Sequence, residues 1–170
     1  MRKTSLYRQP LGNPIPIAEL ITPNQARLLP QSTHGVRIAS SVRILGCGGL
    51  EIGDDVWVGP DSFIHPTANT TIKIGNHVDI GHCVKIFTGT HDIGQGEHAA
   101  GKGRGLDVKI GNGSWLCAGC MILPGVELPT KTIVAAGSVV NKNPAARFSL
   151  VAGIPAVQKK VYAVEDIVAS

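Results

Sequence analysis

The chain has 170 residues, a formal net charge of +4 and 21 glycines. This length suits one domain with its own core, and the glycines argue against a helical bundle because glycine weakens helix interiors. The charge is too small to indicate nucleic-acid binding, although it suits a small phosphorylated ligand, and no apolar run reaches the roughly eighteen residues of a membrane span. We therefore expect a cytoplasmic protein that neither inserts into a membrane nor binds nucleic acid.

Residues 1–35 form the first predicted segment, an N-terminal extension. It contains "AELITPNQARLLPQST", which indicates a short helix among proline-rich loops. A β-rich domain is predicted over residues 36–145, and residues 146–170 are assigned to a C-terminal segment. We expect both terminal segments to be short extensions of one central domain.

A six-residue repeat begins at Ile52 and dominates the central domain. The phase skips four residues after Ile64, and an aliphatic residue occupies each of twelve repeat positions: Ile52, Val58, Ile64, Ile74, Ile80, Ile86, Ile110, Leu116, Ile122, Leu128, Val134 and Val140. A β-sandwich would alternate with a period of two. A period of six predicts short strands joined by tight corners, with three strands to a coil of eighteen residues. The aliphatic side chains then stack inward, one coil on the next, about 4.8 Å apart.

The repeat is interrupted after the segment "IFTGTHDIG", which contains His91. If residues 92–109 continued the coil, its interior positions would be Asp92, His98 and Arg104, which cannot form an apolar core. We therefore predict that this segment leaves the coil as a loop, with Thr90 still facing inward before it. Long loops in compact domains are usually functional or disordered. His91 is accordingly either a catalytic residue or a solvated corner histidine.

The four cysteines include a C-x-x-C pair, Cys117 and Cys120, with Cys47 and Cys83 elsewhere. A structural zinc site of this type requires a second pair of ligands, which the sequence does not supply. The repeat explains Cys120 as a small interior residue. We expect no metal site.

Several segments resemble the hexapeptide-repeat acyltransferases, over about residues 36 to 160. The repeats "IGDDVWVGPDSFI", "IGNHVDIGHCVKI" and "IGNGSWLCAGCMILPGVEL" carry this resemblance, and "VKIFTGTHD", "AAGSVVNK" and "VAGIPA" resemble the branch of galactoside, maltose, nodulation-factor and polysaccharide O-acetyltransferases. The resemblance implies an all-β fold, a left-handed parallel β-helix with a protruding loop. It also implies a homotrimer that transfers acetyl from acetyl-CoA, as co-substrate, to a saccharide hydroxyl, with a surface-polysaccharide precursor as the expected acceptor.

The same resemblance makes His91 the general base, beside a loop that covers a site between two subunits. An imidazole accepts a proton near neutral pH, so it can activate a sugar hydroxyl for attack on a thioester. The acceptor-binding residues implied are Asp61, Asn69 and Asp92. The repeat places Glu127 one coil beyond His91, where it either orients the imidazole or is a solvated surface carboxylate.

Coenzyme binding is implied for a second set of residues. Small side chains admit the pantetheine arm, and a lysine acts as a point charge toward phosphate. The set comprises Trp115, Ala118, Gly119, Ala136, Gly137, Asn141, Lys142 and Lys160.

Two other activities occur in proteins of this kind. One is N-acetylation of an amino sugar. The other is the zinc chemistry of γ-class carbonic anhydrases, for which His65, His77 and His82 are the available histidines. The third ligand of such a triad would fall at Phe87, so the triad is broken. A non-catalytic scaffold would share the repeat but would not explain His91 and its loop.

Overall fold

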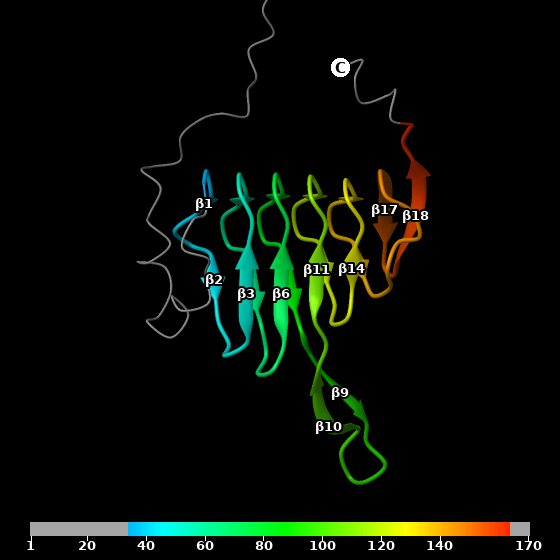
Figure 1. Ribbon diagram of the computed structural model, residues 1–170. Helices are drawn as coiled ribbons and strands as arrows, with labels where there is room; N and C mark the ends of the chain where they lie inside the picture. The colour runs from blue at the N-terminus through cyan, green and yellow to red at the C-terminus, as the bar shows by residue number, and fades with distance from the viewer. Residues whose placement is uncertain (1–33, 164–170) are drawn as a thin grey trace, which may run out of the picture.

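A computed structural model describes residues 34–163, which wind into a three-sided coil of parallel strands (Figure 1). The short helix predicted within residues 1–35 lies outside the described residues. Among the described residues, no helix is long and apolar enough to cross a membrane.

Each side of the coil is one sheet, and successive strands of the chain visit the three sheets in turn. Sheet A contains β1 (Arg37–Ile38), β4 (Trp57–Val58), β7 (Asp79–Ile80), β12 (Trp115–Leu116), β15 (Ile133–Val134), β17 (Ser149–Gly153) and β18 (Ala156–Val161). Sheet B contains β2 (Arg43–Ile44), β5 (Phe63–His65), β8 (Lys85–Phe87), β13 (Met121–Ile122) and β16 (Val139–Val140). Sheet C contains β3 (Gly49–Ile52), β6 (Thr71–Ile74), β11 (Val108–Ile110) and β14 (Glu127–Leu128).

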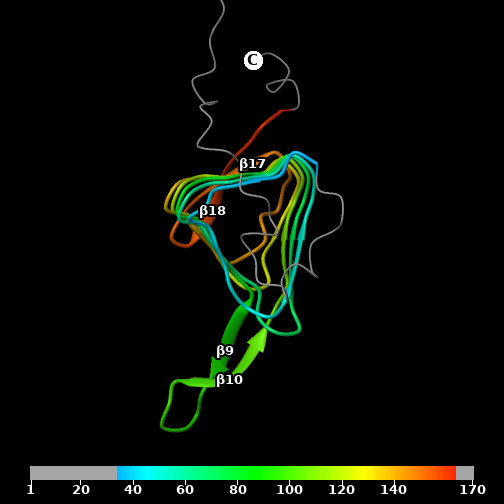
Figure 2. The same cartoon turned by 90° about the vertical axis from the view of Figure 1, so that its left-hand side faces the viewer.

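The pairing register confirms three strands to a coil of eighteen residues. Ile110 pairs with Leu128, eighteen residues later, whereas Ile52 pairs with Ile74 across a coil that contains the four-residue skip. Figure 2 looks along the coil from its N-terminal end. In this view each turn of the chain runs up sheet C, across sheet A and down sheet B (Figures 1 and 2). The chain therefore turns counterclockwise while it moves away from the viewer. That sense of rotation makes the coil left-handed, as expected from the resemblance.

The core is the column of inward side chains predicted by the repeat. All twelve aliphatic repeat positions are at most 3% exposed. Cys120 is fully buried among them, which agrees with its assignment as a small interior residue. Burial of these apolar side chains is the main source of stability in such a stack.

One corner departs from the predicted phase. Thr90 is only half-buried, while Thr88 and Thr70 are the buried residues there. The physical reason is that the chain leaves the coil directly after Thr88, at the corner between sheets B and C. The expectation that Thr90 faces the core is therefore wrong.

The excursion is an antiparallel hairpin of β9 (Gly89–Ile93) and β10 (Ala100–Gly105). It projects from the triangular cross-section at the corner between sheets B and C, and β9 bends outward on the side of sheet B (Figure 2). The excursion starts and ends earlier than the predicted segment 92–109, because Val108 is already buried in sheet C. Its glycine-rich strands therefore form backbone pairs rather than an irregular loop.

The stack extends beyond the predicted end of the β domain at residue 145. β17 adds to β15 in parallel, and β18 then folds back on β17 antiparallel at the edge of sheet A. The reversed strand β18 presents its own outer edge at this end of the coil.

Candidate active site

His91 lies in the middle of β9, exposed, on the projecting hairpin. Across the hairpin, His91 pairs with Gly103. Because Gly103 has no side chain, it does not cover the imidazole. The adjacent Asp92 carboxylate forms an ion pair with Arg104, with Arg104 Nε 3.1 Å from Asp92 Oδ1. Asp92 is therefore a cross-strand partner within the hairpin as well as a predicted acceptor contact.

The base of the hairpin is fixed by a buried polar cluster. Thr88 is fully buried, and its Oγ1 accepts a hydrogen bond from the Thr67 N–H at 2.7 Å. The same oxygen lies 2.6 Å from Thr70 Oγ1. Gly89 and Gly105 pass so close to Thr67 and Thr70 that a Cβ on either glycine would collide with them. The two hairpin strands are thus anchored on the Thr67–Thr70 turn of the preceding coil.

The predicted acceptor contacts Asp61 and Asn69 lie at different corners. Asn69 belongs to the Thr67–Thr70 turn beneath the hairpin, whereas Asp61 sits at the corner between sheets A and B. Both are exposed and have positive φ, 59° and 60°, which Asp and Asn tolerate better than most residues. Each therefore also serves as a corner residue of the coil.

Glu127 does not lie against His91. It begins β14 in sheet C, where its Oε1 accepts a hydrogen bond from Lys109 Nζ at 2.8 Å. The hairpin carries His91 out of the coil, so the residue beside Glu127 in the preceding coil is Lys109. The interaction with Glu127 raises the pKa of Lys109. Of the two roles left open for Glu127, its exposed ion pair with Lys109 supports that of a surface carboxylate.

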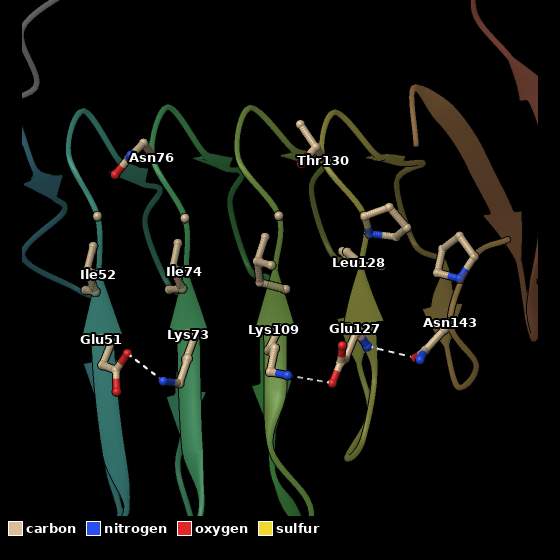
Figure 3. Close-up of a pocket in the computed structure, with 16 residues that line it drawn as sticks. Glu51, Ile52, Lys73, Ile74, Asn76, Lys109, Glu127, Leu128, Thr130 and Asn143 are labelled. Carbon is tan, nitrogen blue, oxygen red and sulfur yellow. Dashed lines mark hydrogen bonds and ion pairs between the residues drawn. The ribbon is translucent and has the colours of Figure 1, made fainter. Parts of the chain in front are cut away.

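A shallow groove of about 1010 Å³ crosses the outer face of sheet C, which the sequence did not predict as a site (Figure 3). Lys73 Nζ lies 3.0 Å from Glu51 Oε2, and Lys109 pairs with Glu127, so its charges are mutually neutralised. The lining residues include no histidine, cysteine or serine. The groove therefore supplies no imidazole base and no thiol of its own.

The small residues predicted to meet the coenzyme do gather at one corner, between sheets A and B. Ala118 and Gly119 follow β12, and Ala136 and Gly137 occupy the same corner one coil later. All four are exposed, and the Gly137 N–H donates to the Ala118 carbonyl at 3.0 Å. This corner presents backbone with almost no side-chain cover.

The other predicted coenzyme residues lie at three separate places on the stack. Trp115 is 52% exposed on the outer face of sheet A, beside the small-residue corner. Asn141 and Lys142 follow β16 and are exposed. Lys160 lies on β18, with its Nζ 4.6 Å from the centre of the Tyr162 ring. No carboxylate of the described residues pairs with either lysine, so both are available to an anionic ligand.

Within one chain, His91 and the small-residue corner stand at opposite ends of the strands of sheet B. β13 and β16 begin after the small-residue corner, while the hairpin follows the end of β8 in the same sheet. The outer face of sheet B lies between them. The structure therefore brings the four small coenzyme residues together at one corner, but it places Asn141 and Lys142 at the hairpin end of sheet B and Lys160 on β18 at the edge of sheet A.

The outer face of sheet B carries an aromatic cluster that the sequence did not predict. The Phe63 ring lies 5.6 Å from both the His65 and Phe87 rings, measured between centroids. Phe63 and Phe87 each flank an inward isoleucine of the repeat, so their outward direction was readable from the sequence. The contact between Phe63 and Phe87 also depends on the register between their two coils. The four-residue skip after Ile64 changes that register.

The histidines and cysteines form no metal site in residues 34–163, where no three metal-binding side chains converge. His65 packs in the aromatic cluster, His77 Nδ1 lies 3.1 Å from Asp55 Oδ2, and the His82 ring lies against Trp57. These three histidines therefore belong to separate surroundings.

Known proteins with similar sequences are acetyltransferases or are named for nodulation. The galactoside O-acetyltransferase of Lactococcus lactis is 37% identical over 75 residues, which are 44% of this chain and 36% of that protein. Nodulation protein L of Rhizobium leguminosarum is 35% identical over 77 residues, 45% of this chain and 40% of that protein. These matches thus span well under half the length of each relative. No family model matches the chain.

Solved structures give matches over a larger share of the chain. A hexapeptide-repeat-containing acetyltransferase from Vibrio cholerae, solved with acetyl coenzyme A, is 25% identical with a TM-score of 0.52, covering 82% of this chain and 74% of that one. A maltose O-acetyltransferase from Clostridium difficile has a TM-score of 0.57 at 24% identity, covering 82% and 73%, and shows the likeness of fold alone. These findings confirm the resemblance to the hexapeptide-repeat acyltransferases.

Proposed function

We propose that this chain, which is similar to the hexapeptide-repeat acyltransferases in sequence and in fold, transfers the acetyl group of acetyl-CoA to a hydroxyl of a saccharide. The observation that carries the proposal is His91, an uncovered imidazole on a hairpin that the Thr67–Thr70 turn anchors to a rigid stack. A general base must be held firmly and remain accessible to its substrate. A surface-polysaccharide precursor is the acceptor we propose.

His91 acts as the general base in this reaction. It accepts the proton of the acceptor hydroxyl, and the oxygen forms a bond to the thioester carbonyl carbon. Backbone N–H groups stabilise the negative charge that develops on the carbonyl oxygen. When the carbon–sulfur bond breaks, protonated His91 returns the proton to the leaving sulfur, so the products are the acetyl ester and the free thiol.

The small-residue corner is the proposed seat of the pantetheine arm. Ala118, Gly119, Ala136 and Gly137 leave the backbone open there, and Trp115 flanks the arm. Asn141, Lys142 and Lys160 are assigned to the phosphates, because the two lysines have no carboxylate partner among the described residues. Asp61, Asn69 and Asp92 are assigned to the acceptor.

A homotrimer would complete the site. His91 and the small-residue corner are separated within one chain, and a neighbouring chain can bring its corner to the hairpin. Large apolar side chains also remain exposed on the chain, among them Trp115, Ile154 and Val157, which supports burial against a neighbour. In this arrangement the hairpin of one subunit and the small-residue corner of the next line one cleft.

The experiment that tests the function is a panel of neutral, acidic and amino sugars incubated with acetyl-CoA. We expect acceptor-dependent release of free thiol and a product that hydroxylamine cleaves, since hydroxylamine cleaves esters. A hydroxylamine-resistant product would instead identify an amide, and with it N-acetylation of an amino sugar. Absence of thiol release with every acceptor would contradict the proposal.

A further inference from the structure

The outer face of sheet B beside the hairpin differs sharply from the outer face of sheet C. Its two outward rows of side chains, here called face B, are Arg43, Phe63, Lys85, Met121 and Val139, and Leu45, His65, Phe87, Leu123 and Asn141. None of these ten residues is acidic. Face B is therefore apolar and aromatic, and carries only positive formal charge.

The two cations of face B have no acidic partner. Lys85 stands in register with Phe63, and no carboxylate in residues 34–163 pairs with it. Arg43 places its guanidinium carbon 5.2 Å from the centre of the Phe63 ring and likewise has no ion pair in that range. On sheet C, by contrast, Lys73 and Lys109 each pair with a glutamate. The unpaired charge of face B is thus complementary to an anionic ligand.

The aromatic cluster supplies an apolar platform next to these cations. The Phe63 and His65 rings are stacked at 27°, and the Phe87 ring meets Phe63 edge-on at 67°. All three side chains are half-buried, so they are held by their neighbours while part of each ring faces outward. A pyranose ring has an apolar face of C–H groups that packs on such a surface.

The platform lies within reach of the proposed base. Phe87 is the last residue of β8, and His91 follows four residues later, at most about 13 Å along an extended chain. The hairpin bends outward on the side of sheet B, so it forms one wall above face B (Figure 2). A sugar unit seated on Phe63 and Phe87 therefore leaves its own or a neighbouring hydroxyl near His91.

Resting on the proposed function, we infer that the acceptor carries an acidic sugar unit, a uronate, whose ring packs on Phe63, His65 and Phe87 and whose carboxylate binds Lys85 and Arg43. A carboxylate fits better than a phosphate, because phosphate sites commonly add free backbone N–H groups to their side-chain cations. The N–H groups of β5 and β8 are already committed to pairing between coils. Asp61, at the neighbouring corner, forms no ion pair with either cation in the described residues.

The test is a binding measurement on the full chain without acetyl-CoA, so it does not depend on turnover. Methyl glycosides of glucose, galactose and mannose are each compared with the corresponding methyl uronide and with the 6-phosphate of the same sugar, by calorimetry or ligand-observed NMR. In at least one series we expect the uronide to bind about tenfold more tightly than the neutral glycoside, the factor typical of one charge-assisted hydrogen bond. Added salt should reduce the difference.

Variants assign the preference to face B. Lys85→Gln combined with Arg43→Gln should abolish the uronide preference and leave neutral-glycoside binding unchanged, whereas the matched control Lys73→Gln on sheet C should retain the preference. Phe87→Ala should weaken all three ligands of the preferred series.

Two binding results would overturn the inference: equal binding of uronides and neutral glycosides in every series, or tighter binding of the sugar phosphate than of the uronide. Two variant results would also overturn it: an unchanged uronide preference in the double variant, or loss of coenzyme A binding in Lys85→Gln. Failure of the proposed function is a separate result. Uronide binding without thiol release would refute acetyl transfer alone, and thiol release from neutral sugars without a uronide preference would refute the inference alone.

Discussion

His91 combines the features required of a general base at the scale of a single residue. It is exposed, faces a glycine across the hairpin, and needs no apolar contact to hold the fold. His91→Ala should lower kcat by about a hundred- to ten-thousand-fold, the usual worth of general-base catalysis, with little change in acetyl-CoA affinity. The melting temperature should scarcely change, because surface substitutions of this kind have small effects. Thiol release and a thermal melt check both; near-normal turnover would make the histidine structural.

Lys142 and Lys160 are the lysines we assign to coenzyme phosphates. Their charges have no carboxylate partner among the described residues, so their removal should cost binding rather than stability. Replacing both by alanine should raise the KM for acetyl-CoA several-fold and leave the KM for the acceptor nearly unchanged. Replacing Lys73 and Lys109 on sheet C provides the control. If neither constant changes in the Lys142 and Lys160 variant, these residues do not belong to the site.

Cys120 and Cys117 illustrate how burial sets reactivity. Burial raises the pKa of Cys120 to about 12, with a contribution from nearby Cys117, and burial also raises the pKa of Cys117. The thiolate is the reactive form, so at pH 8 the exposed Cys47 and Cys83 should react with a thiol reagent while Cys120 reacts only on unfolding.

The same shifts give the sign of a pH effect on stability. The folded chain holds these protons more tightly than the unfolded chain, so the stabilisation is complete below the ordinary thiol pKa of about 8.5 and is lost as pH rises above it. Urea unfolding from pH 7 to 10 should show this decline, and Cys120→Ser at its buried position should reduce it. Rapid labelling of Cys120 in the folded protein would contradict the account.

At the scale of the element, the repeat predicted the core but not the hairpin. One aliphatic residue in six determines which side chains stack inward, so all twelve core positions could be read from the sequence. The hairpin strands consist largely of glycine and polar residues, which carry no strand signal, and only the absence of the repeat marked them. Glu127 was misplaced for the same reason, because counting in sixes takes no account of where the chain leaves the coil.

Thr88 is the residue that ties the hairpin to the stack. Thr88→Val preserves shape but leaves the partly buried Thr67 N–H without its acceptor and removes the buried contact between Thr88 and Thr70. The free energy of unfolding should fall by about 1–3 kcal/mol, the cost of an unsatisfied buried polar group. Urea unfolding measures the loss, and hydrogen exchange should show faster exchange across β9 and β10. Thr90→Val, at a half-buried position, is the control; equal stabilities of the two variants would refute the anchoring role.

At the scale of the whole molecule, the two halves of the site are at opposite ends of sheet B. The sequence placed His91 and the small residues on corners of a coil, but it could not reveal how far apart those corners lie. A second chain that supplies the missing half accounts for both the separation and the exposed apolar side chains. We therefore expect light scattering to give three times the mass of one chain at micromolar concentration.

We propose that His91 of one subunit serves acetyl-CoA bound at the small-residue corner of the next subunit. Two variants, each expected to be inactive alone, test this arrangement. His91→Ala removes the base on the hairpin, and Ala136→Trp fills the exposed small-residue corner. Mixed trimers, purified through a different tag on each chain, contain sites that combine an intact hairpin with an intact corner. These purified mixed trimers should show about one third of wild-type turnover per chain, because one of the three shared sites in each combines an intact hairpin with an intact corner. Mixed trimers that form but remain as inactive as either parent would contradict the shared site.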